Sequence, residues 1–459
     1  MSNHLTRAER LDRLPYMRKH NRMLFGSGVG WALDAMDIGL IAYILLALTK
    51  QWGLSPFEQS ALASTAFIGM ALGASLGGLL ADRIGRRRVF ALTLLVYGLA
   101  TGLSALSTGL VMLLVLRFIV GLGLGGELPV ASTLVSEFSP KRIRGRMVVA
   151  LESFWAVGWL ASALIGYFVV PLENGWRWAL LLGTVPAAWS LVVRLTLPES
   201  VRFLESQGRH AEAEAIVADW ERAAGITPPA ESSGASESSE THVPTAPAKA
   251  RLADLFSGRF RRRTVALWLV WFGVNFAYYG AFIWIPTLLN AGGLTMVKSF
   301  EFTLFMTLAQ LPGYLVAAIL IEVWGRRPTL VAFLGGSAVA AVGFGFSGVI
   351  AQSLAPGSGP WQYGVAMFFG CLLSFFNLGA WGAVYAITPE VYPTTGRASG
   401  AGAATAFGRV AAMVAPIIVP LLATLGLGVL FAVFGVMFAM AMIAGLFLPE
   451  QAGRALEEG

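Results

Sequence analysis

Long, unbroken apolar runs are the feature of this sequence that most restricts its fold. A helix needs roughly 20 apolar residues to cross a hydrocarbon layer of about 30 Å. Twelve such runs occur, at about 23–49, 57–81, 89–107, 110–136, 147–170, 176–195, 264–289, 301–322, 329–350, 362–387, 398–424 and 426–448. They are too long and uniform for the alternating strands, about ten residues each, of a membrane barrel. The sequence therefore predicts an all-α polytopic membrane protein with twelve transmembrane helices.

The composition agrees with this class and excludes others. Only 13% of the 459 residues are Asp, Glu, Lys or Arg, which is about half of the share in a soluble domain. A single cysteine, Cys371, excludes a disulfide scaffold. Residues 1–22 carry six basic residues and no apolar core of a signal peptide. We therefore expect the first run to be retained as a helix.

The basic residues are distributed unevenly between the loops. If the N-terminus is cytoplasmic, the segments on that side hold 28 of the 33 Lys and Arg residues. The opposite loops hold only Lys50, Arg177 and Lys298. Because basic residues collect on the cytoplasmic side, we expect a multi-pass protein of the plasma (inner) membrane with both termini in the cytoplasm. The net charge of +7 then reflects topology and attraction to the lipid bilayer, not nucleic-acid binding.

The sequence also repeats itself. Gly85-Arg86-Arg87 recurs as Gly325-Arg326-Arg327, and Glu137-x-x-Pro140-x-x-x-Arg144 recurs as Glu390-x-x-Pro393-x-x-x-Arg397. Internal repeats of this kind are typical of secondary transporters. We expect two pseudo-symmetric six-helix halves at 1–195 and 264–448, followed by a cytoplasmic tail at 449–459.

Residues 196–263 join the two halves and are predicted to form a cytoplasmic linker. An amphipathic stretch at 200–222 predicts short helices. The tract at 223–250 is rich in Ala, Ser, Glu and Pro and has almost no large apolar residues, so we expect it to be disordered.

The motifs at the loops resemble those of the major facilitator superfamily. Its loop 2–3 motif is matched in full by Gly78-Leu79-Leu80-Ala81-Asp82-Arg83-Ile84-Gly85-Arg86-Arg87-Arg88. Two further stretches, Pro198–Leu204 and Pro389–Pro393, are similar to the sugar-porter and organic-ion branch. The resemblance implies a charge relay at helix ends that holds one conformational state. The gating candidates are Asp82, Arg83, Arg86, Arg87, Glu137, Arg144, Glu390 and Arg397.

Within the superfamily the chain most resembles the bacterial niacin transporters, which are relatives of the synaptic-vesicle glycoprotein 2 group. The resemblance covers all twelve runs and rests on Trp31-x-x-Asp34-Ala35-Met36-Asp37, Gly125–Thr133, Glu152–Trp159 and Phe376–Gly382. The motif Asp34-x-x-Asp37 is also similar to that of aromatic-acid:proton symporters. The 223–250 insert and the extended N-terminus depart from the pattern, outside the membrane. The resemblance implies a monomeric, proton-coupled importer of a small aromatic monocarboxylate, most of all nicotinate. It implies no enzyme activity, cofactor or metal.

Six ionisable residues lie well inside the apolar runs. They are Asp34, Asp37, Arg117, Glu127, Glu152 and Arg409. Each costs about 2.5–3.5 kcal/mol at a helix centre, so such residues are functional candidates. All four histidines lie outside the runs, which assigns proton coupling to the four carboxylates. Asp34 and Asp37 are one helical turn apart, and two close carboxylates do not both ionise easily. A role in helix packing is the alternative for this pair.

The two embedded arginines receive different interpretations. Arg409 lies about twelve residues into its run, where a guanidinium can bind a carboxylate with two hydrogen bonds. By resemblance, anion carriers of the organic-ion branch are basic at this position. The alternative for Arg409 is an ion pair with Asp34, Asp37 or Glu152. Arg117 lies nearly three turns from Glu127, and we expect it to be a structural or gating charge.

Aromatic and amide side chains recur at helical spacing and are candidates for substrate contact. A flat heteroaromatic ring would stack between such side chains while its carboxylate meets a cation. By resemblance to the synaptic-vesicle proteins, Trp155 and Trp381 line a ligand pocket. The alternative is an ordinary membrane core or interface belt. With Arg409, the substrate-binding candidates are Trp31, Trp155, Asn275, Tyr279, Asn377, Trp381 and Tyr385.

Three alternatives stay open. The first alternative cargo is a hydroxybenzoate-like acid instead of nicotinate. The second is an organic cation, because the four embedded acids outnumber the two embedded arginines. The third alternative is of another class, a membrane protein that binds a ligand without transporting it.

The glycines at 121–126 resemble a phosphate-binding loop, but inside an apolar run they predict close helix packing. The sequence offers no His–Cys or His–Glu cluster for a metal.

Overall fold

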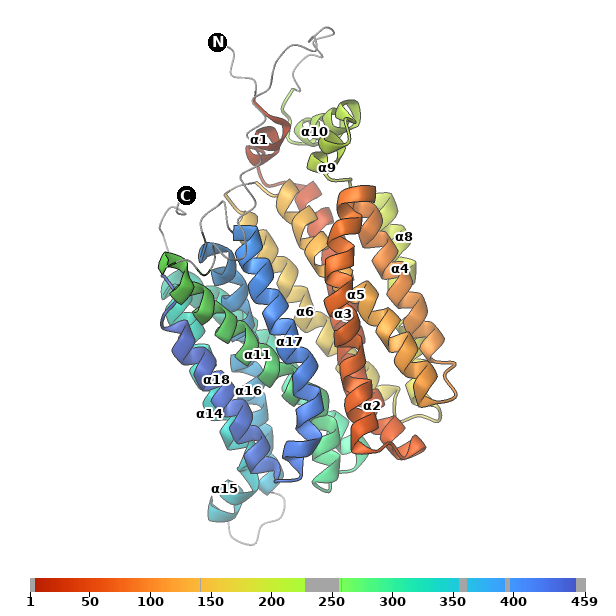
Figure 1. Cartoon of the computed structure of the whole chain (residues 1–459), viewed down its shortest axis with the longest axis vertical. Coiled ribbons are helices and arrows are strands. Elements are labelled where there is room, and N and C mark those ends of the chain that lie inside the picture. The colour runs from red at the N-terminus through yellow and green to blue at the C-terminus, as the bar shows by residue number, and fades with distance from the viewer. Residues whose placement is uncertain are drawn as a thin grey trace.

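The computed structural model is nearly all helical. It describes residues 5–140, 142–227, 256, 258–354, 361–392 and 397–450. Among these residues, eleven helical segments are long and apolar enough to cross a membrane. Long helices run side by side as a bundle, and short helices extend it at one end (Figure 1). The predicted fold class is confirmed.

The helices of the first half follow the predicted runs. They are α2 (Arg18–Trp52), α3 (Pro56–Ile84), α4 (Arg86–Ser104), α5 (Leu110–Phe138), α6 (Arg144–Phe168), α7 (Gly175–Leu182) and α8 (Val185–Thr196). The 19-residue α4 occupies the third run, but it is not one of the eleven segments because three arginines open it. The sixth run is divided between α7 and α8, since the ring of Pro186 clashes with the carbonyl four residues earlier.

The helices that follow the linker also lie in the predicted runs. Its helices are α11 (Gly258–Ala291), α12 (Met296–Leu308), α13 (Gln310–Val323), α14 (Arg326–Gly345), α15 (Ser347–Leu354), α16 (Trp361–Ile387), the 3-10 turn η2 (Thr388–Glu390), α17 (Arg397–Ala423) and α18 (Leu427–Gly445). The eighth run breaks at Ala309, between α12 and α13. Pro312 explains the break, because its ring crowds the carbonyl of Leu308.

Small residues set the packing distance between α3 and α5. A Cβ atom added at Gly121 would lie 2.0 Å from the carbonyl oxygen of Ala66, and one added at Gly73 would lie 2.1 Å from that of Leu122. Only glycine allows the two backbones to approach this closely. The glycines at 121–126 therefore pack helices, as the sequence predicts.

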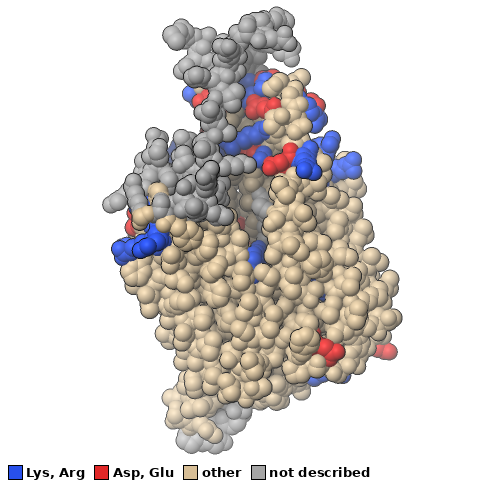
Figure 2. Space-filling view, viewed as in Figure 1, with Lys and Arg blue, Asp and Glu red and all other residues tan. Residues whose placement is uncertain are grey.

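Short helices of the linker dock against the N-terminus. The linker begins with α9 (Val201–Ser206) and α10 (His210–Ala223), and the N-terminal helix α1 (Arg7–Asp12) lies against them. Arg10 forms ion pairs with Glu214 at 2.6 Å and with Glu221 at 2.5 Å. Figure 2 shows charged residues gathered at this end, above a belt that carries few charges. Residues 228–250 of the tract predicted to be disordered lie outside the described residues.

We expect Arg10→Gln to loosen α1 from α10. The Arg10–Glu214 pair is partly exposed and contributes about 0.2–1 kcal/mol. The Arg10–Glu221 pair is largely buried, and removing one partner of a buried pair costs more. Losing both should therefore raise amide exchange in α1 by at least a few-fold. Partial burial opposes ionisation of Glu214, but hydrogen bonds from Arg10 and Arg7 outweigh it and hold its pKa below the ordinary 4.5. The pairing is thus fully present above that value and is lost as pH falls through the lowered pKa. Hydrogen exchange of residues 5–16 measures both effects.

Lys298→Gln is the matched control, because Lys298 forms an exposed pair with Glu301 on α12, far from α1 in the sequence. It should leave exchange in α1 unchanged. Equal exchange in the parent protein and in Arg10→Gln would show that these pairs do not hold α1.

Candidate functional site

A small cavity is formed by side chains of both halves. Its wall consists of Glu152, Trp155, Trp271, Asn275, Tyr279, Tyr314, Trp381, Tyr385 and Arg409. Its volume is about 20 Å³, which is room for about one water molecule. Seven of these nine residues are candidates from the sequence. The helices α6, α11, α16 and α17 thus bring together residues that lie far apart in the chain.

Arg409 supplies the positive charge of the cavity wall. The preceding residue, Gly408, lets α17 approach α11, because a Cβ atom there would lie 2.7 Å from Nδ2 of Asn275. The Tyr279 hydroxyl and the Glu152 carboxyl lie close enough to interact with the guanidinium. One terminal nitrogen, Nη1, is buried without a hydrogen-bond partner in the described part of the chain. Arg409 therefore keeps a donor free for an anion.

Aromatic rings build a platform beside this cation. Trp381 and Tyr385 stack with centroids 5.8 Å apart and planes inclined by 28°. Trp271 meets both rings edge-on, at 5.7 Å and 5.3 Å. The indole nitrogen of Trp271 donates to Oγ1 of Thr388 at 3.0 Å, which fixes that ring. A flat aromatic ligand can stack on such a platform.

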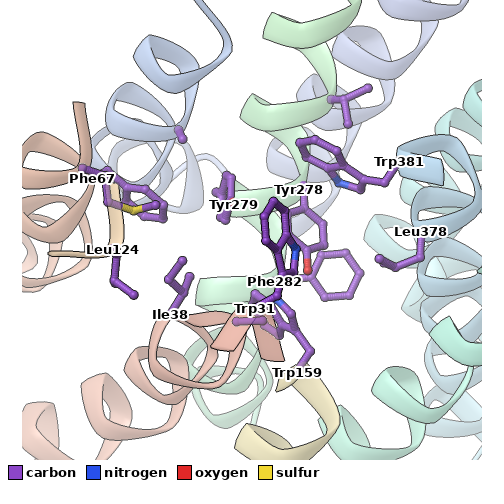
Figure 3. Packing of buried hydrophobic residues seen from close by; sticks show 14 of the residues in the cluster. Trp31, Ile38, Phe67, Leu124, Trp159, Tyr278, Tyr279, Phe282, Leu378 and Trp381 are labelled. Carbon is purple, nitrogen blue, oxygen red and sulfur yellow. The ribbon is translucent and has the colours of Figure 1, made fainter. Parts of the chain in front are cut away.

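The first half contributes Trp155 and Glu152 from α6. The Trp155 indole nitrogen donates to the Tyr278 hydroxyl of α11 at 3.3 Å, so this contact joins the two halves. Figure 3 shows Tyr278 between Tyr279 and Trp381, with Trp159 below them in the view. Ring contacts between Trp159 and Tyr278, at 5.4 Å, continue the same interface.

Two substrate-binding candidates are not part of the cavity wall. Trp31 is 3% exposed and lies close to Glu152. Asn377 is fully buried, and both polar atoms of its amide lack a hydrogen-bond partner among the described residues. The row Asn377, Trp381, Tyr385 rotates by about 40° at each four-residue step. This rotation brings the last two side chains to the cavity and turns the first away.

Sequence reasoning missed two residues of the wall. Trp271 precedes Asn275 and Tyr279 at four-residue intervals, so the same helical periodicity includes it. Tyr314 follows the break before α13, where periodicity is interrupted. Its sequence surroundings carry no comparable signal.

The embedded carboxylates divide into two groups. Asp37 forms an ion pair with Arg117, at 3.0 Å, and accepts a hydrogen bond of 2.6 Å from the Thr101 hydroxyl. Asp34 instead faces Glu127 of α5 and Tyr97 of α4. Asp34 and Asp37 therefore have different hydrogen-bonding partners, although the charge of Asp37 still acts on Asp34. Residues three positions apart differ by about 60° around the helix axis, which is enough to give them different partners.

The gating candidates form equivalent contacts in the two halves. Arg86 pairs with Glu137, which also accepts a hydrogen bond from Ser200. In the second half Arg326 pairs with Glu390 at 2.8 Å. Each of these arginines opens the helix that follows a glycine with positive φ, Gly85 at 103° and Gly325 at 100°.

A second acid caps each of these helices. Glu199 accepts a hydrogen bond from the backbone N–H of Arg87 at 3.0 Å. Glu450 accepts from those of Arg326 and Arg327, at 3.2 and 2.8 Å. Carboxylates at helix N-termini are stabilising because they face unpaired N–H groups and the positive end of the helix dipole. Glu450 was not predicted from the sequence.

The remaining gating candidates differ in their surroundings. Asp82 and Arg83 are exposed at the end of α3. Arg144 pairs with Asp12 and donates to the Ser136 carbonyl at 2.8 Å, which ties α6 to the N-terminal segment. The side chain of Arg397 lies outside the described residues.

Comparisons with known proteins agree with this architecture. The sequence profile described as "Sugar (and other) transporter" matches residues 26–459. The niacin transporter NiaP of Acinetobacter baylyi is 46% identical over 451 residues, which is 98% of this chain and 98% of that protein. A synaptic vesicle 2-related protein of Xenopus laevis is 30% identical and covers 94% of this chain and 78% of its own length.

Solved structures resemble the fold. The xylose transporter XylE from E. coli, in a partially occluded inward-open conformation, matches with a TM-score of 0.75 at 19% identity. The match covers 96% of this chain and 100% of that one. At this identity the likeness concerns the arrangement of helices alone.

Proposed function

The chain belongs to the sugar (and other) transporter family of the major facilitator superfamily, and we propose that it imports nicotinate together with a proton. As a member of this family it is a multi-pass membrane transporter of small molecules and not an enzyme. The relative that is 46% identical over nearly its whole length is a niacin transporter. The cargo is therefore inferred from that relative and from the chemistry of the cavity.

The observation that carries the proposal is the free donor of Arg409 beside an aromatic platform. Nicotinate combines a carboxylate with a flat heteroaromatic ring. The guanidinium binds the carboxylate, while the ring stacks on Trp381 and Tyr385 and meets Trp155 from the other half. Asn275 and Tyr279 offer further polar contacts to the bound carboxylate. Because the cavity has room for about one water molecule, the halves must separate to admit a ligand.

This need for separation supports alternating access. Residues 1–195 and 264–448 rock against each other about the cavity, joined by the linker at 196–263, with the tail at 449–459. Both termini lie in the cytoplasm, and the unit of transport is one chain in the plasma membrane. The pairs Arg86–Glu137 and Arg326–Glu390 hold the helix ends of each half together during the movement. Coupling to one proton makes transport of the nicotinate anion electroneutral.

We expect an inward proton gradient to accelerate uptake of labelled nicotinate into vesicles that contain the purified protein. A membrane potential alone should not, because the transported charge is zero. Excess unlabelled nicotinate should inhibit uptake, whereas nicotinamide, which lacks the carboxylate, should inhibit far less. Protein-free vesicles measure the passive entry of the neutral acid and are the control.

Each arm of this experiment tests one part of the proposal. Uptake that does not depend on the proton gradient would contradict proton coupling. Inhibition by nicotinamide as strong as that by nicotinate would contradict the proposal that Arg409 binds the carboxylate. Stronger inhibition by hydroxybenzoates than by nicotinate identifies the aromatic-acid alternative, and inhibition by amines identifies the cation alternative.

A further inference from the structure

A second cavity lies at the linker end of the first half, apart from the aromatic site. Its volume is about 190 Å³, which is room for several water molecules or one small polar group. The start of α4, the segment between α8 and α9, and α10 contribute to its wall. The charged residues of this wall are Arg87, Arg88, Glu199, Arg209 and Glu212. None of them lines the cavity around Arg409.

The positive charges of this wall are only partly compensated. Arg209 pairs with Glu212 at 2.6 Å. Glu199 accepts a hydrogen bond from the backbone N–H of Arg87 at 3.0 Å, so this acid is also engaged. The Arg88 guanidinium forms neither an ion pair nor a hydrogen bond within the described part of the chain, and its charge acts on Glu212 only through space. Nε of Arg87 is buried without a hydrogen-bond partner among the described residues. Two guanidinium groups therefore keep donors for an anion.

Arg88 lies on the face of α4 that points outward from the bundle. Three exposed leucines follow it at spacings of four, three and four residues: Leu92, Leu95 and Leu99. Such spacings place side chains in one row along a helix. The neighbouring helix α8 packs against α4 at the edge of the bundle (Figure 1) and exposes Leu195 close to its own linker end. Arginines near the ends of membrane-spanning helices extend toward the lipid head groups. The cavity therefore lies at the head-group end of a surface that acyl chains cover.

A phospholipid phosphate fits both parts of this arrangement. A guanidinium binds two phosphate oxygens with charge-assisted hydrogen bonds. The Leu197 carbonyl accepts a hydrogen bond from Arg87 at 3.3 Å, which holds this guanidinium beside the cavity. In the proposed topology this end of the bundle faces the cytoplasm, where the leaflet has a negative surface potential. A soluble anion would use the arginines alone, whereas an anionic phospholipid uses the arginines and the row of leucines.

We propose that this cavity binds the phosphate of an anionic phospholipid, whose acyl chains lie along Leu92, Leu95 and Leu99. Arg87 and Arg88 bind the phosphate oxygens. Because the wall also includes residues of α10, the bound lipid ties the linker helices to the start of α4. The site is separate from the one proposed for nicotinate, so the lipid should bind whether or not nicotinate is present.

Competition between two lipids, read out by native mass spectrometry, tests this site. The purified protein is incubated in detergent with equal amounts of phosphatidylglycerol, which is anionic, and phosphatidylcholine, which is zwitterionic. The parent should retain phosphatidylglycerol preferentially. Arg88→Gln should lower that affinity by about fivefold, which is the factor for one basic residue at an anionic surface. Arg222→Gln is the matched control, because Arg222 is exposed on α10 but lies outside the cavity wall. It should retain as much phosphatidylglycerol as the parent.

A variant with the opposite effect distinguishes the cavity from general positive charge. Glu212→Gln removes a carboxylate from the wall and releases Arg209, so it should raise the affinity for phosphatidylglycerol by a similar factor. If Arg88→Gln does not assemble, the parent and Glu212→Gln still decide the question. Equal retention of both lipids by the parent, an equal loss in Arg88→Gln and Arg222→Gln, or unchanged retention in Glu212→Gln would overturn the proposal.

A second competition distinguishes a lipid from a soluble phosphate. Inorganic phosphate and glycerol 3-phosphate carry the same anionic group but have no acyl chains to lie on the leucines of α4. At concentrations equal to that of the lipid, they should leave bound phosphatidylglycerol in place. Displacement by either compound would identify a soluble anion as the ligand and would overturn the assignment to a phospholipid.

Discussion

Arg409→Ala is expected to weaken nicotinate binding by at least about 30-fold. Truncating one partner of a buried, hydrogen-bonded charge pair costs about 2–5 kcal/mol, and 2 kcal/mol corresponds to about that factor. The substrate carboxylate would be left in a small cavity whose remaining acid, Glu152, repels it. Calorimetric titration of the purified protein with nicotinate measures the loss.

Two comparisons make this result specific. Arg409→Lys keeps the charge but loses the planar fork that grips a carboxylate with two bonds, so its affinity should fall between the parent and Arg409→Ala. Nicotinamide has no carboxylate, and its weak binding should change little in either variant. Unchanged nicotinate affinity in Arg409→Ala would mean that the carboxylate is bound elsewhere.

The cavity residues show which features of the site helical spacing can predict. Glu152 and Trp155, one turn apart, and Trp381 and Tyr385, also one turn apart, each lie on one face of a helix whatever the helix packs against. A single sequence can therefore identify these faces. It does not say which helices meet, so Asn377 is a candidate by the same spacing although its side chain lies away from the cavity.

The carboxylates show where spacing stops being informative. The distance from Asp34 to Asp37 along the helix is fixed, but their partners depend on how closely α2, α4 and α5 approach. That approach is set by small residues such as Gly30, where any side chain would collide with Glu127. Contacts between helices that lie about 90 residues apart leave no local pattern in one sequence.

The repeated helix caps could be predicted only in part from the sequence. Gly85-Arg86-Arg87 and Gly325-Arg326-Arg327 are visible repeats, and the sequence predicts equivalent roles for them. The acids that cap these helices, Glu199 and Glu450, come from the ends of the sixth and twelfth runs. Each follows a proline in the sequence, which is a weak signal alone. The structure shows that the two acids accept hydrogen bonds from equivalent backbone N–H groups, those of Arg87 and Arg327.

Arg117→Met is expected to cause the largest loss of stability among the embedded charges. Arg117 and Asp37 are 1% and 0% exposed, and removing one partner of a buried ion pair costs about 3–5 kcal/mol because the other charge stays unpaired. The Thr101 hydroxyl alone cannot compensate Asp37. Thermal unfolding of the purified protein should therefore begin at a clearly lower temperature than in the parent.

The double variant Asp37→Leu with Arg117→Met separates stability from movement. Replacing both members by apolar residues removes the unpaired charge, and such replacements are often neutral or stabilising. The double variant should therefore recover most of the thermal stability lost in Arg117→Met. If it is stable and still exchanges nicotinate, the pair is structural. If it is stable but inactive, the pair takes part in gating. A double variant as unstable as Arg117→Met would show that geometry around the pair, and not its charge, holds these helices together.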